Sequence, residues 1–517
     1  MKTTFVNAHF HTMRDEGDVK ESMTVNDGVI VGFDRAANGR TVDLGGAHVY
    51  PAMTDAHLHM LDAIALDGVG IEICRITDEG VEPRTLDGVE RMIRAHAARH
   101  KGPLMVFTNY ISAVMDVKRL PTRFELDEWT GGAAAWVLNI DGHSSSCSSA
   151  LLERAALPDA PEDGILAGPS HDANLGVFTG LMASCITPSI LARGIAHFCN
   201  ECARYGIATV CALEGTDDSE RDRSTEMIAA LAQRFPIDVR LFPQYMDRTK
   251  LASVDARMKT PRVGGCMKWE LDGSVGSRTA AFRDPYRDGS TGELYFSDDE
   301  LRAAVAAFAQ EGRLVSAHAI GERAIDQLLS IYENVPGRHR IDHCEFPAPD
   351  ALERIYALSP FVTVQPGYAW IDKRYLHGYE TFLSAEQIAR QIPLRDMARR
   401  GVVLCGSSDA PVQSVDPFLQ MRGMRDFYLP EQSLTAYEAL RTYTVNGGIM
   451  LGETKGLLEE GYVASFFTTE RDLLTMAPEE LAGMHADALY LRGKAYRALP
   501  DGIAALARLA CSKKRAI

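Results

Sequence analysis

The chain has 517 residues and a formal net charge of −16 at pH 7. This acidic balance argues against nucleic acid or an anionic membrane as a partner, because both require basic patches. The length suffices for one large catalytic domain and a smaller one. The chain has no run of about 18 apolar residues and no apolar signal core at its amino terminus. We therefore expect no transmembrane helix, a cytoplasmic location and a small-molecule substrate.

Residues 1–50 form short strand-like runs separated by turn signals such as Asn26-Asp27-Gly28. This segment contains an HxH pair, His9 and His11, which leads into a polar loop instead of ending a buried strand. We interpret this pair as structural.

A second HxH pair, His57 and His59, follows the short apolar run 47–50, which is typical of a buried strand. Residues two apart on a strand point to the same side, so both imidazoles face one direction. Asp55 precedes them as a plausible supporting partner. The pair predicts half of a metal site, although an isolated HxH also arises by chance.

Residues from about 60 to 205 are helical in places and include two strand candidates, at 103–107 and 135–140. The second candidate ends in Asp141-Gly142-His143, before a polar run. At that position His143 could face a pocket or could be an ordinary loop histidine. The one CxxC pair, Cys199 and Cys202, falls in a helical stretch, and we expect it to be a pair of buried free thiols.

Apolar strand-like runs alternate with helical patterns from residue 206 onward, which predicts a parallel sheet. With the strand before His57 there are eight runs, the number that a (β/α)8 TIM barrel requires. The seven later runs lie at 206–210, 237–242, 265–269, 314–318, 340–343, 361–364 and 402–405. Their cysteines, Cys266 among them, are expected in the core.

Residues able to bind a metal stand at the ends of these runs. Active sites of such barrels collect at the carboxyl ends of the strands, so we interpret these residues as one metal site. They are His57 and His59 after the first strand, Lys268, His318 and His343 at the ends of the fourth to sixth, and Asp409 after the eighth.

The segment 51–59, PAMTDAHLH, resembles the metal-binding signature of the amidohydrolase superfamily. The strings at 268–280, 318–324 and 406–409 resemble its YtcJ-like (amidohydrolase 3) branch, as do those at 141–143 and 443–446. The resemblance runs from about residue 3 to residue 497. In three places the chain departs from the branch, at Ala52, Glu322 and Ser465, and none of these is a proposed ligand.

The resemblance implies a small composite β-sandwich that both chain ends form beside the barrel. Its parts would be residues 1–50 and 441–497, with the metal-dependent hydrolase barrel at 51–440 and an insertion at about 60–205. Strand-like runs near 464–468 and 488–496 support this division. Residues 498–517 form a helical, basic-ended tail that could dock on a partner subunit of a homodimer or simply fray.

Zinc suits imidazole and carboxylate ligands, and manganese and iron are also compatible. We expect His57, His59 and Asp409 to hold one ion and His318 and His343 a second. Relatives in the superfamily carry a carboxylated lysine on the fourth strand, which Lys268 resembles, and such a carbamate would bridge the two ions.

A one-ion version remains open. In it His57, His59, His318 and Asp409 bind the ion, His343 contacts water or substrate, and Lys268 acts only through its charge. A third alternative is an unmodified Lys268 paired with Asp272 or Glu270.

In both metal versions the ion lowers the pKa of its bound water to about 7. The resulting hydroxide attacks a carbonyl carbon, Asp409 serves as general base and then as general acid, and His143 helps to stabilise the oxyanion. We therefore expect hydrolysis of a non-peptide C–N bond in an amide, N-substituted formamide, cyclic amide or carbamate-like compound. The alternatives are a heterocycle deaminase, a decarboxylase and a scaffold without catalysis.

Five residues that follow or end strands are candidates for substrate contact. Arg278 could bind a carboxylate through two hydrogen bonds or form a structural salt bridge, and the tryptophans could belong to the core. The five are His143, Trp269, Arg278, Tyr368 and Trp370.

Overall fold

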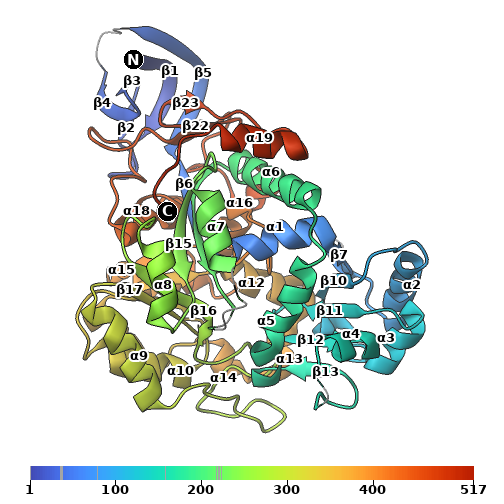
Figure 1. Ribbon diagram of the computed structural model, residues 1–517. Helices are drawn as coiled ribbons and strands as arrows, with labels where there is room; N and C mark the ends of the chain where they lie inside the picture. The colour runs from blue at the N-terminus through green and yellow to red at the C-terminus, as the bar shows by residue number, and fades with distance from the viewer. Residues whose placement is uncertain are drawn as a thin grey trace.

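The computed structural model describes residues 2–34, 39–77, 80–157, 159–216, 218, 222 and 224–517. Figure 1 shows three parts: a sheet at the top that contains the N-terminus, a central body of strands and helices, and an insertion on the right with a sheet of its own. The central body confirms the expected α/β architecture.

The sheet at the top joins both ends of the chain. Its strand order is β23-β22-β21-β5-β1-β3-β4, with β2 paired to β1. The strands are β1 (Thr3–His11), β2 (Val19–Lys20), β3 (Met23–Asn26), β4 (Val29–Phe33), β5 (Arg40–Pro51), β21 (Phe466–Thr469), β22 (Ala488–Leu491) and β23 (Lys494–Ala495). Phe5 packs edge-on against Phe466, with ring centroids 5.0 Å apart, so the two chain ends share one apolar core. A two-sheet sandwich stays a prediction.

Eight further strands form two parallel sheets in the central body, ordered β15-β14-β6 and β16-β17-β18-β19-β20. They are β6 (Met53–Leu58), β14 (Ile207–Glu214), β15 (Asp238–Pro243), β16 (Arg262–Glu270), β17 (Leu314–Ala319), β18 (Arg340–His343), β19 (Phe361–Val364) and β20 (Val403–Gly406). Seven of them lie on or beside runs expected from the sequence. The run expected before His57, at 47–50, belongs instead to β5 of the sheet that joins the chain ends, and β6 follows it. Because β5 ends at Pro51 and β6 begins at Met53, one nearly continuous extended segment leads from the chain-end sheet into the body.

Hydrogen bonds connect the two parallel sheets at both of their edges. Beyond β20, the Asp409 N–H donates to the His57 carbonyl at 2.9 Å, and the His59 N–H donates to Ala410 at 2.8 Å. At the other edge, the Arg262 guanidinium donates to the Leu241 carbonyl at 3.2 Å. The first pair of bonds fixes the end of β6 directly beside the segment that follows β20.

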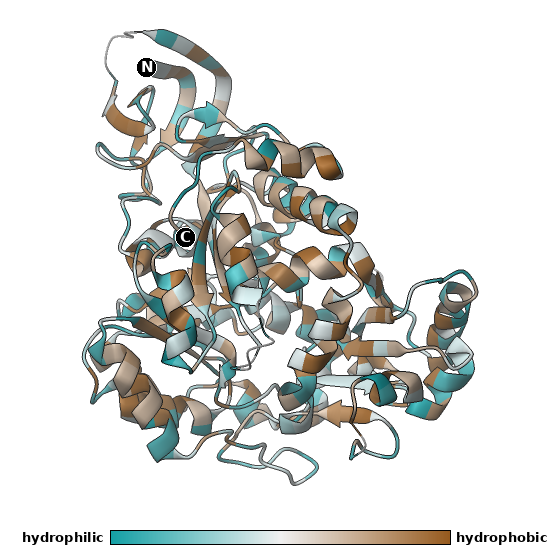
Figure 2. Ribbon diagram, in the orientation of Figure 1, coloured by the Kyte–Doolittle hydropathy of each residue, from teal (hydrophilic) through white to brown (hydrophobic). Residues whose placement is uncertain are grey.

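Helices pack around these strands because one face of each is apolar, and Figure 2 shows hydrophobic and hydrophilic segments alternating along them. Ser297 caps α9 with a capping box to Glu300, and Leu301, Val305 and Phe308 form its buried face. The helices are α1 (Met60–Val69), α2 (Leu86–Ala97), α3 (Arg123–Thr130), α4 (Ser149–Arg154), α5 (Pro169–Ala183), α6 (Pro188–Arg204), α7 (Ser224–Ala232), α8 (Arg248–Asp255), α9 (Asp298–Gln310), α10 (Glu322–Tyr332), α11 (Pro349–Leu358), α12 (Pro366–Ile371), α13 (Gly378–Phe382), α14 (Ala385–Ile388), α15 (Leu394–Arg399), α16 (Pro417–Arg425), α17 (Ala436–Tyr443), α18 (Val445–Leu451) and α19 (Ile503–Ala510).

Among the described residues, no single helix is long and apolar enough to cross a membrane. One pair, α5 and α6, passes the length and composition criteria only when taken together, and it is bent by 111°.

The insertion carries a five-stranded sheet ordered β13-β12-β11-β10-β7. Its strands are β7 (Gly70–Glu72), β10 (Met105–Tyr110), β11 (Ala135–Asn139), β12 (Ser144–Cys147) and β13 (Ile165–Ala167), with a separate hairpin of β8 (Arg75–Thr77) and β9 (Gly80–Glu82). The turn between β11 and β12 contains His143, and α5 follows β13 directly. In Figure 1, α5 stands between the insertion sheet and the central body.

The C-terminal tail packs on its own chain. Leu509 of α19 is buried, and the Ile517 N–H donates to the Arg257 carbonyl at 2.9 Å. Lys259 in turn donates its N–H to the Ile517 carbonyl at 3.0 Å. A homodimer stays a prediction.

The first HxH pair lies in the chain-end sheet. His11 Nε2 is hydrogen-bonded to His48 Nδ1 at 2.9 Å, and the Tyr50 hydroxyl donates to Asp472 at 2.6 Å. Burial lowers the pKa of His11 to about 4, against the opposing charge of Asp472. The cluster therefore favours a neutral His11.

This burial predicts a stability that decreases in acid. The folded-state pKa of His11 lies below the unfolded value of about 6.5, so the unfolded chain binds the proton first. The contribution is complete above pH 6.5 and is lost as the pH falls toward 4, by about 2–3 kcal/mol. Urea unfolding at pH 7 and pH 4.5 should show a smaller loss for His11→Gln than for wild type. His197→Gln, which changes an exposed histidine, is the control and should lose as much unfolding free energy between pH 7 and pH 4.5 as wild type. An equal loss in all three proteins would contradict the assignment to His11.

Candidate metal centre

Donor atoms from three strand ends converge around Asp409. His57 Nε2 lies 3.2 Å and His59 Nε2 lies 3.4 Å from Asp409 Oδ1. His57, His343 and Asp409 each offer one donor atom, and these atoms lie within 4.8 Å of one another. The structure thus brings together four residues that the sequence assigned to one site.

The backbone at this point adopts a conformation that side-chain-bearing residues rarely adopt. Met267, His343 and Asp409 have φ values of 56°, 69° and 58°, in the left-handed region. Such conformations cost about 1 kcal/mol or more each and cluster at functional sites. The backbone is therefore strained within β16, at the end of β18 and in the segment after β20, close to the donor atoms of the site.

A buried carboxylate orients His57. His57 Nδ1 lies 3.1 Å from Asp342 Oδ1, which leaves Nε2 facing Asp409. Asp342 also accepts a hydrogen bond from the Thr363 hydroxyl at 2.7 Å and pairs with Arg340 at 2.9 Å. Such partners fix the ring orientation of a metal-binding histidine.

His318 and His343 also lie beside polar groups, but only His343 forms a hydrogen bond through Nδ1. His318 Nδ1 lies 3.4 Å from Asp272, and His343 Nδ1 is hydrogen-bonded to Gln365 at 2.9 Å. Their rings lie 4.6 Å apart. The Nε2 atom of His318 and the Oδ1 atom of Asp409 are buried without a hydrogen-bond partner. Unpartnered buried donors and acceptors of this kind fit a bound cation, which would replace the missing hydrogen bonds.

Cys266 belongs to the same centre. Its sulfur lies 3.5 Å from His57 Nε2, and His57, His59 and Cys266 offer donor atoms within 4.8 Å of one another. Burial alone would raise the pKa of the Cys266 thiol, but His57 and the neighbouring imidazoles outweigh it and lower that pKa well below its usual range. A thiolate is a preferred zinc ligand. The expectation of an ordinary core cysteine is therefore incomplete.

The structure corrects the expected place of Lys268. The pairing of β16 with β17 shifts between Gly265 and Glu270, which is a bulge in the strand. The bulge leaves Cys266 and Glu270 buried and turns Lys268 to an exposed position. A lysine exposed in this way does not lie between buried ions, so the expected bridging carbamate has no support in the structure.

His143 lies above the centre in the turn after β11. Its ring centroid is 5.2 Å from that of His318, and its Nδ1 atom is 3.7 Å from Asp172 of α5. His143, Asp172 and Glu270 offer donor atoms within 4.8 Å of one another. Burial raises the pKa of Glu270 to about 8, with the charge of Asp172 adding to the effect. Neither Asp172 nor Glu270 was assigned to the site from the sequence. Glu270 lies within an apolar run and Asp172 follows the polar pair Ser170-His171, so neither position gave a clear signal.

Two hollows meet at the centre and together form one cleft. They share the residues Asn139, Ile140, Asp141, His143, His318, His343, Asp409 and Val412. We call the first the tyrosine lobe; its wall includes Ile320, Glu345, Tyr368, Tyr379 and Phe382. We call the second the methionine lobe; its wall includes His59, Leu138, Leu175, Met182, Met267 and Glu270. Within the described residues, no lysine or arginine lines either lobe.

Of the expected substrate contacts, His143 and Tyr368 line the cleft. The Tyr368 hydroxyl donates to Asp409 Oδ2 at 2.9 Å. Trp269 is fully buried against Phe308, with ring centroids 5.4 Å apart, and lines neither lobe. Trp269 is therefore a core residue and not a substrate contact.

Arg278 and Trp370 also lie outside the two lobes. Arg278 pairs with Asp288 at 3.2 Å, so it is a structural salt bridge, the alternative left open by the sequence. The Trp370 indole donates to Asp426 at 3.0 Å and lines a third hollow, which adjoins both lobes at Ile140 and Val412. The assignment of Arg278 to substrate binding is corrected, and that of Trp370 stays a prediction.

The model of the amidohydrolase family matches residues 40–496 of the chain. The chain is 25% identical to the putative amidohydrolase YtcJ of Bacillus subtilis (strain 168), over 93% of this chain and 96% of that protein. It is 24% identical to the N-substituted formamide deformylase of Arthrobacter pascens, over 94% of this chain and 97% of the relative. A solved structure of an uncharacterized metal-dependent hydrolase from Pyrococcus horikoshii OT3 has a similar fold, with a TM-score of 0.71 at 22% identity, covering 93% and 99% of the two chains.

The contact between Asp342 and His57 predicts how a metal should bind. Asp342→Asn removes the negative charge that holds the His57 ring, so the affinity for zinc should fall about 10–100-fold. Competition with a chromophoric chelator measures this affinity directly. Asp288→Asn is the matched control, because it removes a carboxylate charge that pairs with Arg278 and accepts hydrogen bonds from Ser290 on the exposed surface. Equal zinc affinity in both variants would show that Asp342 does not support the site.

Proposed function

Because this chain belongs to the amidohydrolase family, we propose that it is a metal-dependent hydrolase of a non-peptide C–N bond. The observation that carries the proposal is the convergence of His57, His59, His343 and Asp409 at the ends of parallel strands. The relative named N-substituted formamide deformylase supports an amide or formamide as substrate.

A closed (β/α)8 barrel is part of the same proposal. The hydrogen bonds at both edges of the two parallel sheets support it, as does the similarity in fold to a solved metal-dependent hydrolase. In such a barrel the active site lies at the carboxyl ends of the strands, where the donor atoms meet here.

The donor set fits a borderline divalent ion, because imidazoles, a thiolate and a carboxylate are typical zinc ligands. His57, His59, Cys266 and Asp409 would hold it, with His343 beside them. Zinc is our proposal, and manganese or iron are the alternatives. When bound, such an ion supplies Lewis acidity and lowers the pKa of a water molecule to about 7.

The side chains around the centre can move the proton that hydrolysis requires. Asp409 Oδ1 faces the imidazoles while Oδ2 accepts the hydrogen bond of Tyr368. We assign Asp409 as the base that removes a proton from the attacking water and then returns it to the leaving nitrogen. Tyr368 is a positioning residue, since its hydroxyl holds the carboxylate in this orientation.

The cleft favours an uncharged substrate. Lobes on both sides of the centre leave room for one substituent on the carbonyl side of the scissile bond and another on the nitrogen side. Neither lobe presents a lysine or arginine among the described residues, so a substrate carboxylate would find no cationic partner there. This argues for a neutral amide over an acid that would be decarboxylated.

Removal of the metal and of the base should each abolish turnover. Chelator-treated protein should lose activity on a panel of formamides, cyclic amides and carbamates, and zinc or manganese should restore it. Asp409→Asn should reduce kcat by about 10²–10⁴-fold, because it removes the proton acceptor. The products should be an acid and an amine, detected by mass spectrometry. Undiminished turnover by the chelated protein, or ammonia released from heterocycles only, would overturn the proposal.

Tyr368 should affect the rate without changing the fold. Tyr368→Phe removes one hydrogen bond to a charged group, worth about 1.5–3 kcal/mol, so we expect kcat to fall about 10–100-fold. The pH at which activity rises should also shift, since the environment of Asp409 changes. Tyr437→Phe, whose hydroxyl contacts the backbone of Met13, is the control. Identical pH profiles for wild type and Tyr368→Phe would remove Tyr368 from the mechanism.

A further inference from the structure

We propose that His143, Asp172 and Glu270 form a second divalent-cation site beside the centre at His57, at the wall of the methionine lobe that His143 and Glu270 line. The inference rests on the proposed metal-dependent function. It assigns the second ion to residues outside the metal ligands expected from the sequence, with Glu270 in place of a carboxylated Lys268.

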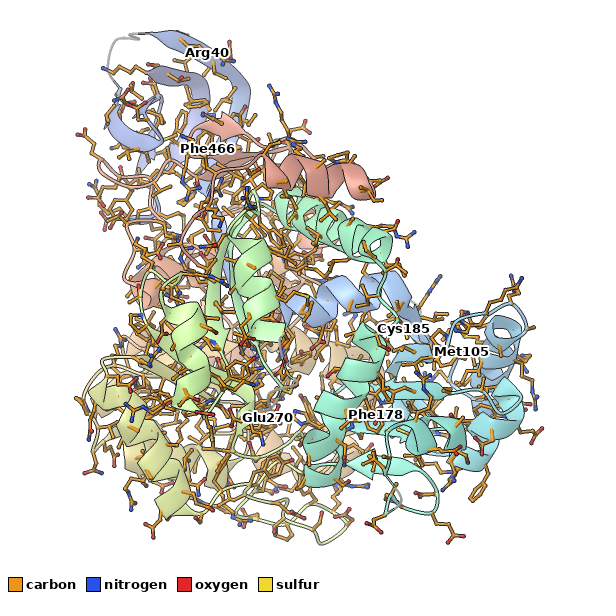
Figure 3. All side chains as sticks on the ribbon, viewed as in Figure 1. Arg40, Met105, Phe178, Cys185, Glu270 and Phe466 are labelled. Carbon is orange, nitrogen blue, oxygen red and sulfur yellow. The ribbon has the colours of Figure 1, made fainter. Side chains whose placement is uncertain are left out.

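Three separate elements bring the three side chains together. Glu270 ends β16, His143 lies in the turn between β11 and β12, and Asp172 lies in the first turn of α5. One donor atom from each lies within 4.8 Å of the others, and His143 Nδ1 is 3.7 Å from Asp172 Oδ1. Figure 3 labels Glu270 in the central body, between β16 and α5. Elements far apart in the sequence thus deliver three potential ligands to one point.

Each of these side chains has a buried polar atom without a hydrogen-bond partner. The atoms are Glu270 Oε2, Asp172 Oδ2 and His143 Nδ1. Glu270 is only 5% exposed, and its other oxygen already accepts the Met267 N–H at 2.8 Å. Leaving charged oxygens buried and unpartnered is unfavourable. A divalent cation would satisfy all three atoms at once.

The chemistry of the cluster favours a divalent ion over other cations. Two carboxylates and an imidazole form a typical ligand set for zinc, manganese or iron. His318 stands between the two sites: its ring lies 5.2 Å from His143 and 4.6 Å from His343, and its Nε2 atom is unpartnered. His318 can therefore serve either ion. In this arrangement His143 is a ligand and does not make the oxyanion contact expected from the sequence.

The bulge in β16 explains why Glu270 replaces Lys268. Regular pairing would point residues 266, 268 and 270 to the same side of the strand. The shift between Gly265 and Glu270 keeps Cys266 and Glu270 buried but turns Lys268 outward. One strand thus supplies a thiolate to the first site and a carboxylate to the second.

Cobalt substitution tests the second site by a signal other than activity. Metal-free full-length protein is loaded with Co²⁺, and the cobalt per chain is measured together with the sulfur-to-cobalt charge-transfer band that reports Cys266. We expect two cobalt ions per chain in wild type. Glu270→Gln and Asp172→Asn should each bind one ion and retain the sulfur band. Lys268→Met should still bind two.

The outcomes separate this inference from the proposed function. Wild type with one cobalt and the sulfur band, unchanged in Glu270→Gln, would overturn the second site and leave the first intact. Wild type with no cobalt and no sulfur band would overturn the proposed function itself. If Lys268→Met lost one cobalt, the ligand would be Lys268 and not Glu270. Butylammonium tests whether the cluster binds an organic amine instead of a metal ion. If wild type bound one cobalt and also bound butylammonium, and Glu270→Gln did not bind butylammonium, the cluster would be a site for a substrate amine. This result would also overturn the proposal.

Discussion

The buried contact between Asp342 and His57 holds the centre of the molecule together. Burial raises the pKa of the Asp342 carboxyl, but Arg340 and His57 outweigh this effect and hold that pKa far below its usual range. Arg340 also donates to the Ala56 carbonyl at 2.8 Å, and Thr363 donates to the same aspartate. Strands β6, β18 and β19 therefore meet at one ionised group. Loss of one partner from a buried pair of this kind costs about 3–5 kcal/mol.

This network links the folding of the body to the geometry of the site. His57 receives its orientation from Asp342, and the backbone bonds of His57 and His59 place Asp409 beside them. The carboxylate is therefore positioned by main-chain hydrogen bonds as well as by its own side chain. Catalytic groups that are held in place before the reaction begins lower its barrier more than groups that must be positioned during the reaction.

Much of the architecture could be predicted from the sequence, because buried parallel strands leave short apolar runs and their ends carry polar residues. His57, His59, His343 and Asp409 were found in this way. The role of β16 could not be predicted, because its pairing is irregular where it advances five residues, from Gly265 to Glu270, while β17 advances one, and this leaves no signature in an apolar run. Lys268 was therefore placed inside and Cys266 in the core. Asp172 was missed because its partners come from other elements.

Residues of the insertion line both lobes of the cleft, but the helices that line them differ: α5 lines only the methionine lobe, and α12 and α13 line only the tyrosine lobe. Leu138, Leu175 and Met182 of the insertion line the methionine lobe, whereas Tyr368 and Tyr379, from α12 and α13, line the tyrosine lobe. The insertion enters the chain after β6 and leaves it before β14. Changes confined to α5 can therefore remodel one half of the cleft while the other half and the His57 centre keep their supports. Such a division lets relatives of this fold diverge in the group they accept on one side of the scissile bond independently of the other.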